Sequence, residues 1–414
     1  MVYDSARQRT VMFGGGNGNN LADTWEWDGM RWARIKPATS PPGRHQHAMA
    51  YDPARRRAVM FGGWNGSSPM NDTWEWDGKN WTQIRPATSP SARLNHAMAY
   101  DSVRRHTVMF GGWNGSYFSD TWEWNGKNWT QIKPATPPPA RTSHTMAYDS
   151  SRRRTVLFGG YARGNGYFSD TWEWDGKSWA QNSPVTFPPG RSDHAMVYDL
   201  ARGRTVMFGG YGRRNLADTW EWNGKSWAQI KPATSPSGRQ QHAMAYDLAR
   251  RRTVMFGGWS PGPSADMWEY AIPSPATFTT FGTGCKGSAG IPQLTAMTQP
   301  VYGKTFTTTL SRLQTAPAAG PFIAVGMSNQ QWGAIKLPLN LGILGLPGCK
   351  LLVGADVTLP LKNNAGSARF DLAIPGKNRW LLGKNLYLQG LALDLKANPL
   401  GVALSNAGKA TIGF

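Results

Sequence analysis

A pair of adjacent glycines returns at nearly constant spacing through the first two thirds of the chain, and this limits the folds that are possible. Successive pairs are separated by 48, 49, 48, 50 and 48 residues. The six pairs begin at Gly14, Gly62, Gly111, Gly159, Gly209 and Gly257. A sequence period near 50 residues indicates a repeat architecture, in which each unit packs against its neighbours.

Residues 47–93 form a representative unit, which reads HAMAYDPARRRAVMFGGWNGSSPMNDTWEWDGKNWTQIRPATSPSAR. It divides into four short strands, which we call a (HAMAYD), b (AVMFGG), c (DTWEWD) and d (NWTQIRP). The polar a–b link and the Asp-Gly or Asn-Gly of the c–d link predict tight hairpins. Strand b is apolar at consecutive positions, which is typical of a strand covered on both faces. Four-stranded sheets repeated radially make a β-propeller.

The glycine and tryptophan positions of this unit resemble the kelch motif. Gly62 and Gly63 close strand b, Trp74 and Trp76 lie in strand c, and Trp81 opens strand d. The pattern is complete in five units, and the resemblance covers residues 1 to about 275. It implies a six-bladed kelch-type β-propeller.

The sixth unit departs from the pattern, because the strand c sequence DMWEY is followed by AIPSPATFTTFG, with no tryptophan at the strand d position. Residues 277–281 could supply the missing strand. A segment preceding Met1 could also supply it, or could hold a seventh blade.

Residues 276–414 lack this periodicity and form a second predicted domain. Short strand-like runs separated by turn signals predict an all-β sandwich. The stretches FGTGCKGSAGIP, LPLNLGILGLPGC and LDLKANPLGVALSNA resemble a module at the C-terminal ends of large exported bacterial proteins. This resemblance implies export, and therefore an extracellular or cell-surface location, although the chain shows no signal peptide. In an exported protein Cys285 and Cys349 are expected to pair, whereas in a cytosolic one they would be two small buried hydrophobes.

The chain carries a formal net charge of +20, and both predicted domains are basic. Such a surface favours polyanionic partners, such as acidic glycans, envelope polymers or nucleic acid, or simply keeps the protein soluble. Nucleic acid is not the expected partner, because no recognition motif accompanies the charge. No apolar run approaches 18 residues, so no membrane span is expected.

Alternation of strand direction places the a–b and c–d hairpins on one face of the propeller and the b–c and d–a links on the other. The first face carries arginine clusters such as Arg55–Arg57, which are either a platform for polyanions or soluble hairpin tips protected from edge pairing.

Kelch propellers commonly bind ligands on the second face. Aromatic rings there can stack on sugars or peptide side chains or pack between blades, and arginines can bind carboxylates in bidentate fashion. The predicted ligand-binding residues are Arg44, Arg93, Arg141, Arg191, Arg239, Trp64, Trp113, Tyr161, Tyr211 and Trp259. A histidine follows each of these arginines by three residues, and we interpret the histidines as contacts within the blades.

Catalysis by a carboxylate pair needs two acids in different environments. Every glutamate of the chain occupies the same middle position of strand c, so the glutamates offer no such asymmetry. Asp193, beside His194, is the single asymmetric candidate for catalysis. The propeller has no cysteine, which argues against the copper-radical chemistry of galactose-oxidase-like propellers. No metal or cofactor motif is present, so none is predicted.

These observations predict an exported, non-catalytic binding protein that uses the second face to bind a glycan, acidic or neutral, or a protein. One alternative is an enzyme acting on acidic sugars, mutarotase-like or lyase-like, at the same face. Another is a structural surface protein that self-associates through the C-terminal domain.

Overall fold

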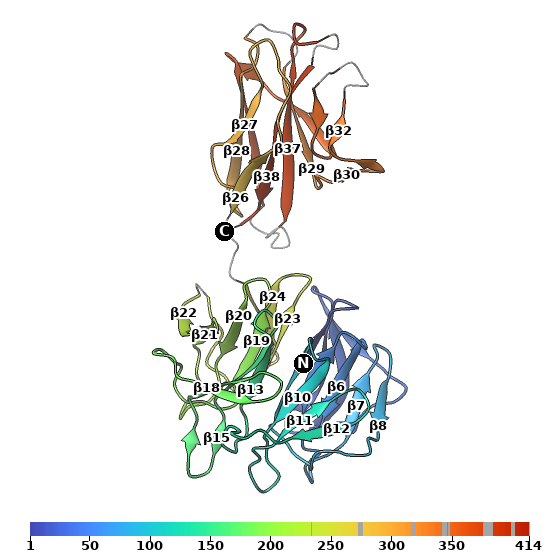
Figure 1. Cartoon of the computed structure of the whole chain (residues 1–414), viewed down its shortest axis with the longest axis vertical. Coiled ribbons are helices and arrows are strands. Elements are labelled where there is room, and N and C mark those ends of the chain that lie inside the picture. The colour runs from blue at the N-terminus through green and yellow to red at the C-terminus, as the bar shows by residue number, and fades with distance from the viewer. Residues whose placement is uncertain are drawn as a thin grey trace. The chain divides into compact units, whose positions relative to one another are not determined.

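The computed structural model describes residues 1–232, 234–271, 276–315, 320–341, 346, 348–375, 384–398 and 402–413. The chain divides into two compact units, Met1–Ala271 and Ile272–Phe414 (Figure 1). Every regular element of the described residues is a β-strand. The all-β class predicted from the sequence is therefore confirmed.

The first unit is a propeller whose first five blades are four-stranded antiparallel sheets. Blade one contains β1 (Val2–Asp4), β2 (Arg9–Gly16), β3 (Asn20–Trp27) and β4 (Trp32–Ile35). Blade two contains β5 (Ala48–Asp52), β6 (Arg57–Phe61), β7 (Thr73–Trp76) and β8 (Trp81–Ile84). Blade three contains β9 (Ala97–Asp101), β10 (His106–Phe110), β11 (Thr121–Trp124) and β12 (Trp129–Ile132).

Blades four to six follow the same plan, with two departures. Blade four contains β13 (Thr145–Asp149), β14 (Arg154–Phe158), β17 (Thr171–Trp174) and β18 (Trp179–Asn182), and its b–c link forms an added hairpin of β15 (Tyr161–Ala162) and β16 (Gly166–Tyr167). Blade five contains β19 (Ala195–Asp199), β20 (Arg204–Phe208), β21 (Thr219–Trp222) and β22 (Trp227–Ile230). Among the described residues, blade six contains β23 (Ala243–Asp247), β24 (Arg252–Phe256) and β25 (Met267–Tyr270) and no fourth strand.

Strand b is apolar at consecutive positions because neighbouring blades cover both of its faces. In β6, Val59, Met60 and Phe61 are completely buried. Met60 belongs to the hydrophobic cluster shared with blade one, whereas Val59 and Phe61 belong to the cluster shared with blade three. Successive side chains of a strand point to opposite faces, so one short run stabilises two interfaces.

The tryptophan that opens strand d joins a blade to the preceding one. The Trp81 indole of blade two donates a hydrogen bond to Thr24 Oγ1 of blade one, at 2.9 Å, and packs edge-on against Phe13. The same hydrogen bond recurs at three further interfaces, as Trp129 to Thr73, Trp179 to Thr121 and Trp227 to Thr171.

Six blades close the ring. The innermost strand β1 contacts both β5 of blade two and β23 of blade six. Across this last interface the backbone N–H of Ala249 donates to the Tyr3 hydroxyl at 3.3 Å, and the Trp32 ring packs against Phe256. Blade one is complete, so closure depends on side-chain packing and not on a strand exchanged between blades one and six.

Residues 277–281 do not complete blade six, and that sequence-based alternative is wrong. They form β26 (Thr277–Phe281), which pairs with β38 (Val402–Thr411) in the second unit. The reason is the packing of Phe278, whose ring contacts Phe306 and the main hydrophobic core of that unit.

The second unit contains two larger sheets. One has the order β26, β38, β37 (Asn385–Leu393), β29 (Phe322–Gly326) and β34 (Val357–Pro360). The other has the order β27 (Gln293–Ala296), β28 (Thr305–Ser311), β36 (Ser367–Ala373) and β35 (Asn363–Asn364). Two small ladders join β30 (Gln331–Trp332) to β31 (Ile335–Lys336), and β32 (Leu339–Asn340) to β33 (Lys350–Leu351).

The two larger sheets share one core. Leu294, Phe306 and Leu310 from the four-stranded sheet pack in the same cluster as Ile323 and Leu388 from the five-stranded sheet. This arrangement is the β-sandwich predicted from the sequence.

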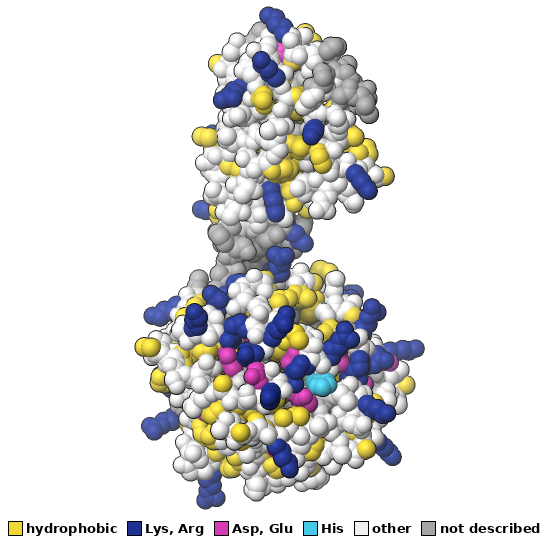
Figure 2. Space-filling model, in the orientation of Figure 1, with side chains coloured by type: hydrophobic (Ala, Val, Ile, Leu, Met, Phe, Trp, Pro, Cys, Tyr) yellow, Lys and Arg dark blue, Asp and Glu magenta, His cyan; other side chains and the backbone are white. Residues whose placement is uncertain are grey.

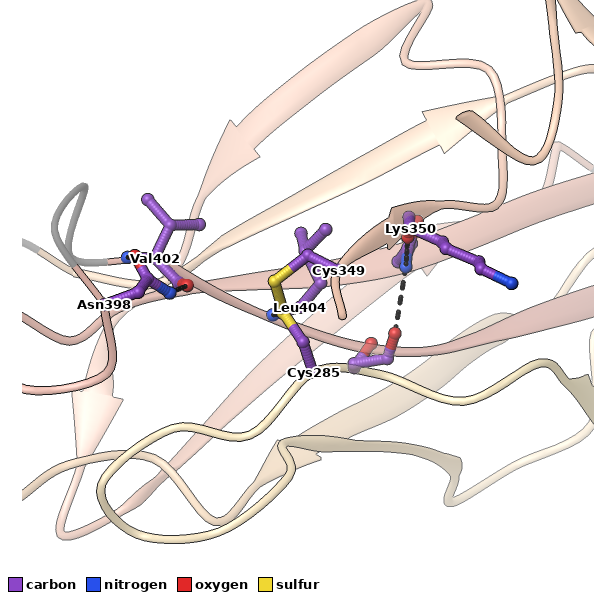
Figure 3. Close-up of a disulfide and its surroundings, with 8 residues drawn as sticks. Cys285, Cys349, Lys350, Asn398, Val402 and Leu404 are labelled. Carbon is purple, nitrogen blue, oxygen red and sulfur yellow. Dashed lines mark hydrogen bonds between the residues drawn. A yellow bond between two sulfur atoms is a disulfide. The ribbon is translucent and has the colours of Figure 1, made fainter. Parts of the chain in front are cut away.

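A disulfide between Cys285 and Cys349 lies in the second unit, with the two Cα atoms 4.8 Å apart (Figure 3). Both half-cystines are buried in a small apolar cluster that includes Leu346 and Leu404. The backbone N–H of Cys285 donates to the Leu404 carbonyl at 2.9 Å, so the bridge ties the loop before Lys350 to strand β38.

Candidate binding surface of the propeller

Contacts between blades define two faces. The side chain of Arg7, in the a–b hairpin of blade one, donates to the carbonyl of Gly78 in the c–d hairpin of blade two, which puts these hairpins on one face. Trp64, in a b–c link, forms a bridge with His45 in a d–a link. We call the first the hairpin face and the second the loop face, and each lies where strand alternation predicts.

The five predicted ligand-binding arginines require a correction, because their side chains are buried. Arg44, Arg93, Arg141, Arg191 and Arg239 are at most 2% exposed. Each forms a bidentate ion pair with the aspartate that precedes strand c of the next blade. The partners, in the same order, are Asp72, Asp120, Asp170, Asp218 and Asp266.

These arginines are part of the interfaces between blades. Arg141 Nη1 also donates to the Gly159 carbonyl at 2.9 Å, and its guanidinium lies 4.0 Å from the centre of the Phe168 ring. With both carboxylate oxygens, a carbonyl and an aromatic face as partners, the guanidinium has no group left for a ligand. We therefore assign the five arginines to the support beneath the loop face.

Four of the five histidines that follow these arginines are buried as well, namely His96, His144, His194 and His242, and His47 is partly exposed. His96 packs edge-on against Phe61 of the preceding blade, and the same contact recurs in the other units. Burial, reinforced by the neighbouring arginine, lowers the pKa of His144 and of His242 to about 3. These rings are thus neutral groups that pack between blades, whereas the sequence-based interpretation placed their contacts within a blade.

Asp193 belongs to a chain of backbone hydrogen bonds that links successive blades. Its N–H donates to the Ser143 carbonyl at 2.9 Å, and its carbonyl accepts from Gln241 at 2.8 Å. Gln46 and Asn95 continue the chain, and all five residues adopt a positive φ between 54° and 59°. Such backbone geometry is unusual for non-glycine residues, and here the repeated hydrogen bonds hold it in place.

The Asp193 carboxylate does not act with His194 in this structure. Ser192 Oγ donates to Asp193 Oδ2 at 2.8 Å, while His194 Nε2 lies 2.7 Å from Thr145 Oγ1. Burial raises the pKa of Asp193, and hydrogen bonds, chiefly from Ser192, partly oppose this rise. The geometry gives Asp193 a structural place in the backbone chain and no base or acid partner among the described residues.

The predicted loop aromatics are more accessible. Trp64, Trp113, Tyr161 and Tyr211 are partly exposed, and Trp259 is 47% exposed. Each forms a backbone bridge with the d–a link that precedes its own blade. The bridges fix where these side chains lie, because they hold the b–c links against the d–a links.

Four tyrosines from three successive blades form a continuous cluster on the loop face. The ring centres of Tyr117 and Tyr161 are 6.4 Å apart, those of Tyr161 and Tyr167 are 5.3 Å apart, and those of Tyr167 and Tyr211 are 5.9 Å apart. The extra hairpin of blade four presents Tyr161 and Tyr167 opposite each other. We call these four residues the tyrosine cluster.

The hairpin face is basic, but one arginine in each cluster is structural. Arg55 donates to Asp52 and Glu75 of its own blade and to the Gly126 carbonyl of the next. The residues at the hairpin tips are solvent-exposed instead, including Arg56, Arg105, Arg153 and Arg251. Figure 2 shows Lys and Arg outnumbering Asp and Glu on the visible surface.

Two kinds of feature are absent from the described part of the chain. It holds no group of three or more His, Cys, Asp or Glu residues that could bind a metal ion. It also contains no helix long and apolar enough to cross a membrane.

Sequence reasoning missed two features. One is the set of aspartates that pair with the buried arginines, each of which lies 27–29 residues after its arginine, in the next unit. An aspartate recurs before the strand c tryptophan in every unit, and this recurrence was the signal that could have predicted the pairs. The tyrosine cluster was not predicted as a unit, because the aromatic positions of different blades lie far apart in the sequence.

Comparison with known proteins identifies one similarity. The family model described as the KLHDC2/KLHL20/DRC7 Kelch-repeats domain matches residues 1–136 and 123–292. No curated protein matches the chain.

Proposed function

Since this chain belongs to the kelch-repeat family, we propose that its propeller is a non-catalytic protein-interaction module that binds its partner on the loop face. Kelch-repeat propellers bind proteins, and the added hairpin of blade four makes the loop face depart from six-fold regularity. The tyrosine cluster is the single observation that carries the proposal, because it is an aromatic surface that only blades three to five provide.

Tyrosine suits such a role for physical reasons. It contributes a large apolar surface with little side-chain entropy to lose, and its hydroxyl can replace hydrogen bonds that water makes in the free protein. Tyr117, Tyr161, Tyr167 and Tyr211 are all partly exposed, so part of each ring is available to a partner.

The support beneath the cluster is rigid. The Arg141–Asp170 and Arg191–Asp218 pairs tie the d–a links to the next blade, with all four N–O distances between 2.6 and 2.8 Å. A surface that is already ordered loses less conformational entropy on binding. The buried arginines therefore support binding indirectly, by holding the links that present the tyrosines.

The partner that fits best is an acidic protein. The chain has a net charge of +20, which favours the approach of a negatively charged partner. Exposed Trp259 and the tyrosine rings would also stack on sugars, so a glycan partner remains the second candidate, supported by the aromatic surface alone.

We further propose that the protein is exported. The observation in favour is the Cys285–Cys349 disulfide, since structural disulfides persist in oxidising compartments and are rare in the cytosol.

Affinity capture with matched variants tests the binding proposal. The immobilised full chain is exposed to the extracellular protein fraction of its source cells, and bound proteins are identified. Tyr167→Ala combined with Tyr211→Ala should abolish capture of the specific partner, while Arg105→Ala combined with Arg153→Ala on the hairpin face should retain it.

The reverse result would overturn the proposal. If the hairpin-face variant loses the partner and the tyrosine variant retains it, binding occurs on the other face. Binding in a glycan array that survives removal of all protein ligands and requires Tyr167 and Tyr211 would replace the protein partner with a sugar.

A further inference from the structure

In the described residues, blade six has no strand d, although the socket that would receive the strand d tryptophan is present. At four interfaces the strand d tryptophan of one blade enters a socket on the preceding blade, made by a threonine hydroxyl and the ring of a phenylalanine. At the interface of blades five and six, Thr219 and Phe208 occupy these two positions. Blade six provides no strand d among the described residues, so no strand d indole occupies this socket.

A groove is present where the tryptophan would lie. It has a cavity volume of about 60 Å³, is partly open to solvent, and is lined by Phe208, Thr219 and Thr234 of blade five and by Met255, Trp268 and Tyr270 of blade six, with other residues. The lining is mainly apolar. The Thr219 hydroxyl occupies the position at which, in the equivalent sockets, a threonine hydroxyl accepts the indole N–H.

A second group in the groove is positioned for the backbone of an incoming strand. In blade one, the Thr39 hydroxyl donates to the Trp81 carbonyl and the Thr39 carbonyl accepts from the Trp81 N–H at 3.2 Å. Thr88 makes the hydroxyl contact to Trp129 in the next unit. Thr234 holds the same place in the PAT sequence of blade five and lines the groove.

The outer edge of β25 completes the site. In blades one to five the corresponding strand pairs with strand d, whereas no strand pairs with the outer edge of β25 in the described residues. An unpaired strand edge offers a row of N–H and C=O groups to an added strand.

We propose that this groove binds an extended segment of a partner protein that carries a tryptophan with an aliphatic residue three positions later. The segment would add to β25 as an antiparallel fourth strand. In blade three Trp129 lies opposite Trp124, and Ile132 lies opposite Thr121. In the same register the partner tryptophan lies opposite Tyr270 and its aliphatic residue opposite Met267.

The occupant follows from interfaces already present in the chain. The groove continues the packing of blade five against blade six. All four filled sockets hold a tryptophan, and in three of them an isoleucine follows it three positions later, as in Trp81–Ile84, Trp129–Ile132 and Trp227–Ile230. A second copy of this chain does not offer the segment, since Trp81, Trp129, Trp179 and Trp227 are at most 3% exposed and Trp32 already lies in β4, paired with β3. The site lies at the outermost strand of a blade and is separate from the tyrosine cluster, so it is independent of the proposed function.

A peptide with the sequence of residues 128–132, Asn-Trp-Thr-Gln-Ile, with blocked ends and a fluorescent label, is the probe. Its binding to the full chain is followed by fluorescence anisotropy. We expect saturable binding that becomes at least about tenfold weaker when the peptide tryptophan is replaced by alanine, because burying an aromatic ring contributes well over 1.4 kcal/mol.

Two variants separate a local effect from general destabilisation. Thr219→Val removes the hydroxyl of the open socket and should weaken peptide binding about fivefold, the effect of one hydrogen bond. Thr121→Val removes the same hydroxyl from an occupied socket and should leave the affinity unchanged. Hydrogen exchange should also slow at residues 267–270 when the peptide is added.

Three results would overturn the proposal. One is the absence of binding at millimolar peptide, and another is equal binding of the alanine peptide. The third is slow exchange at residues 267–270 before any peptide is added, which would show that another segment of the chain or a second copy already covers β25.

Discussion

The indole Nε1 of Trp129 in blade three donates a hydrogen bond to Thr73 Oγ1 in blade two, at 2.9 Å, and the same hydrogen bond joins other successive blades. The equivalent Trp32 of blade one packs against Phe256 of blade six at nearly the same ring distance, 5.4 Å against 5.3 Å for Trp129 and Phe61. Its indole N–H, however, is buried without an acceptor. Met267 occupies the position of the threonine, so the interface of blades six and one is the weaker one.

This difference predicts unequal effects of the same substitution. Trp129→Phe replaces the indole with a smaller ring and removes a hydrogen bond. Trp32→Phe makes the same replacement and removes no hydrogen bond. Urea unfolding should show that Trp129→Phe lowers the free energy of unfolding by about 1 kcal/mol more than Trp32→Phe. Equal losses would show that the hydrogen bond contributes nothing to the interface.

Removal of one partner of a buried ion pair should be costly. Asp170→Ala leaves the Arg141 guanidinium, which is fully buried, without its carboxylate and is expected to lower the free energy of unfolding by about 3–5 kcal/mol. Arg369→Ala, which breaks an exposed pair in the second unit, is the control and should have a much smaller effect. The Arg141→Met and Asp170→Ala double variant should recover part of the loss, and no recovery would argue against a buried charge as its cause.

The buried histidines predict that mild acid destabilises the propeller. His144 and His242 have a pKa of about 3 in the folded state and about 6.5 when unfolded, so the unfolded chain binds more protons between these values. The free energy of unfolding is therefore highest above pH 6.5 and falls as the pH decreases towards 3. Each of the two should contribute a loss of about 2 kcal/mol between pH 7.5 and pH 5.

Urea unfolding at the two pH values measures this effect. A His144→Asn variant should lose about 2 kcal/mol less than the unmodified chain over the same interval. An identical loss in both proteins would mean that protonation of His144 is not coupled to unfolding.

Reduction of the disulfide should affect one unit only. Opening the Cys285–Cys349 bridge, which spans 64 residues, should lower the stability of the second unit by about 4 kcal/mol on the chain-entropy estimate. The described propeller contains no cysteine, so its thermal transition should not move when dithiothreitol is added. Calorimetry with and without the reductant checks both statements, and a shift of both transitions would show that the units unfold together.

The sequence was sufficient to predict much of the fold because each blade repeats the same local signals. The glycine pairs, the hairpin turns and the apolar run at Val59–Phe61 predict four strands per unit without any knowledge of the neighbouring blades. The sequence also showed that blade six has no tryptophan at the strand d position, and the described residues of this blade form no strand d. The partner of residues 277–281 was not predictable, because strand pairing depends on which core accepts Phe278.

The candidate site was predicted only in part for a related reason. Arg141 looks the same in the sequence whether its guanidinium faces solvent or Asp170, and only the packing of blade four on blade three decides this. The loop aromatics were correctly placed on one face, because strand direction alone determines the face. Their association into the tyrosine cluster depends on loop conformations that hairpin patterns do not specify.

Photo-crosslinking from single positions tests the central claim most directly. Benzoylphenylalanine is introduced in place of Tyr211 on the loop face, or in place of Arg153 on the hairpin face, and each protein is irradiated with the extracellular fraction. The proposed function predicts one specific protein adduct from position 211 and none from position 153. An adduct from position 153 alone would contradict binding on the loop face.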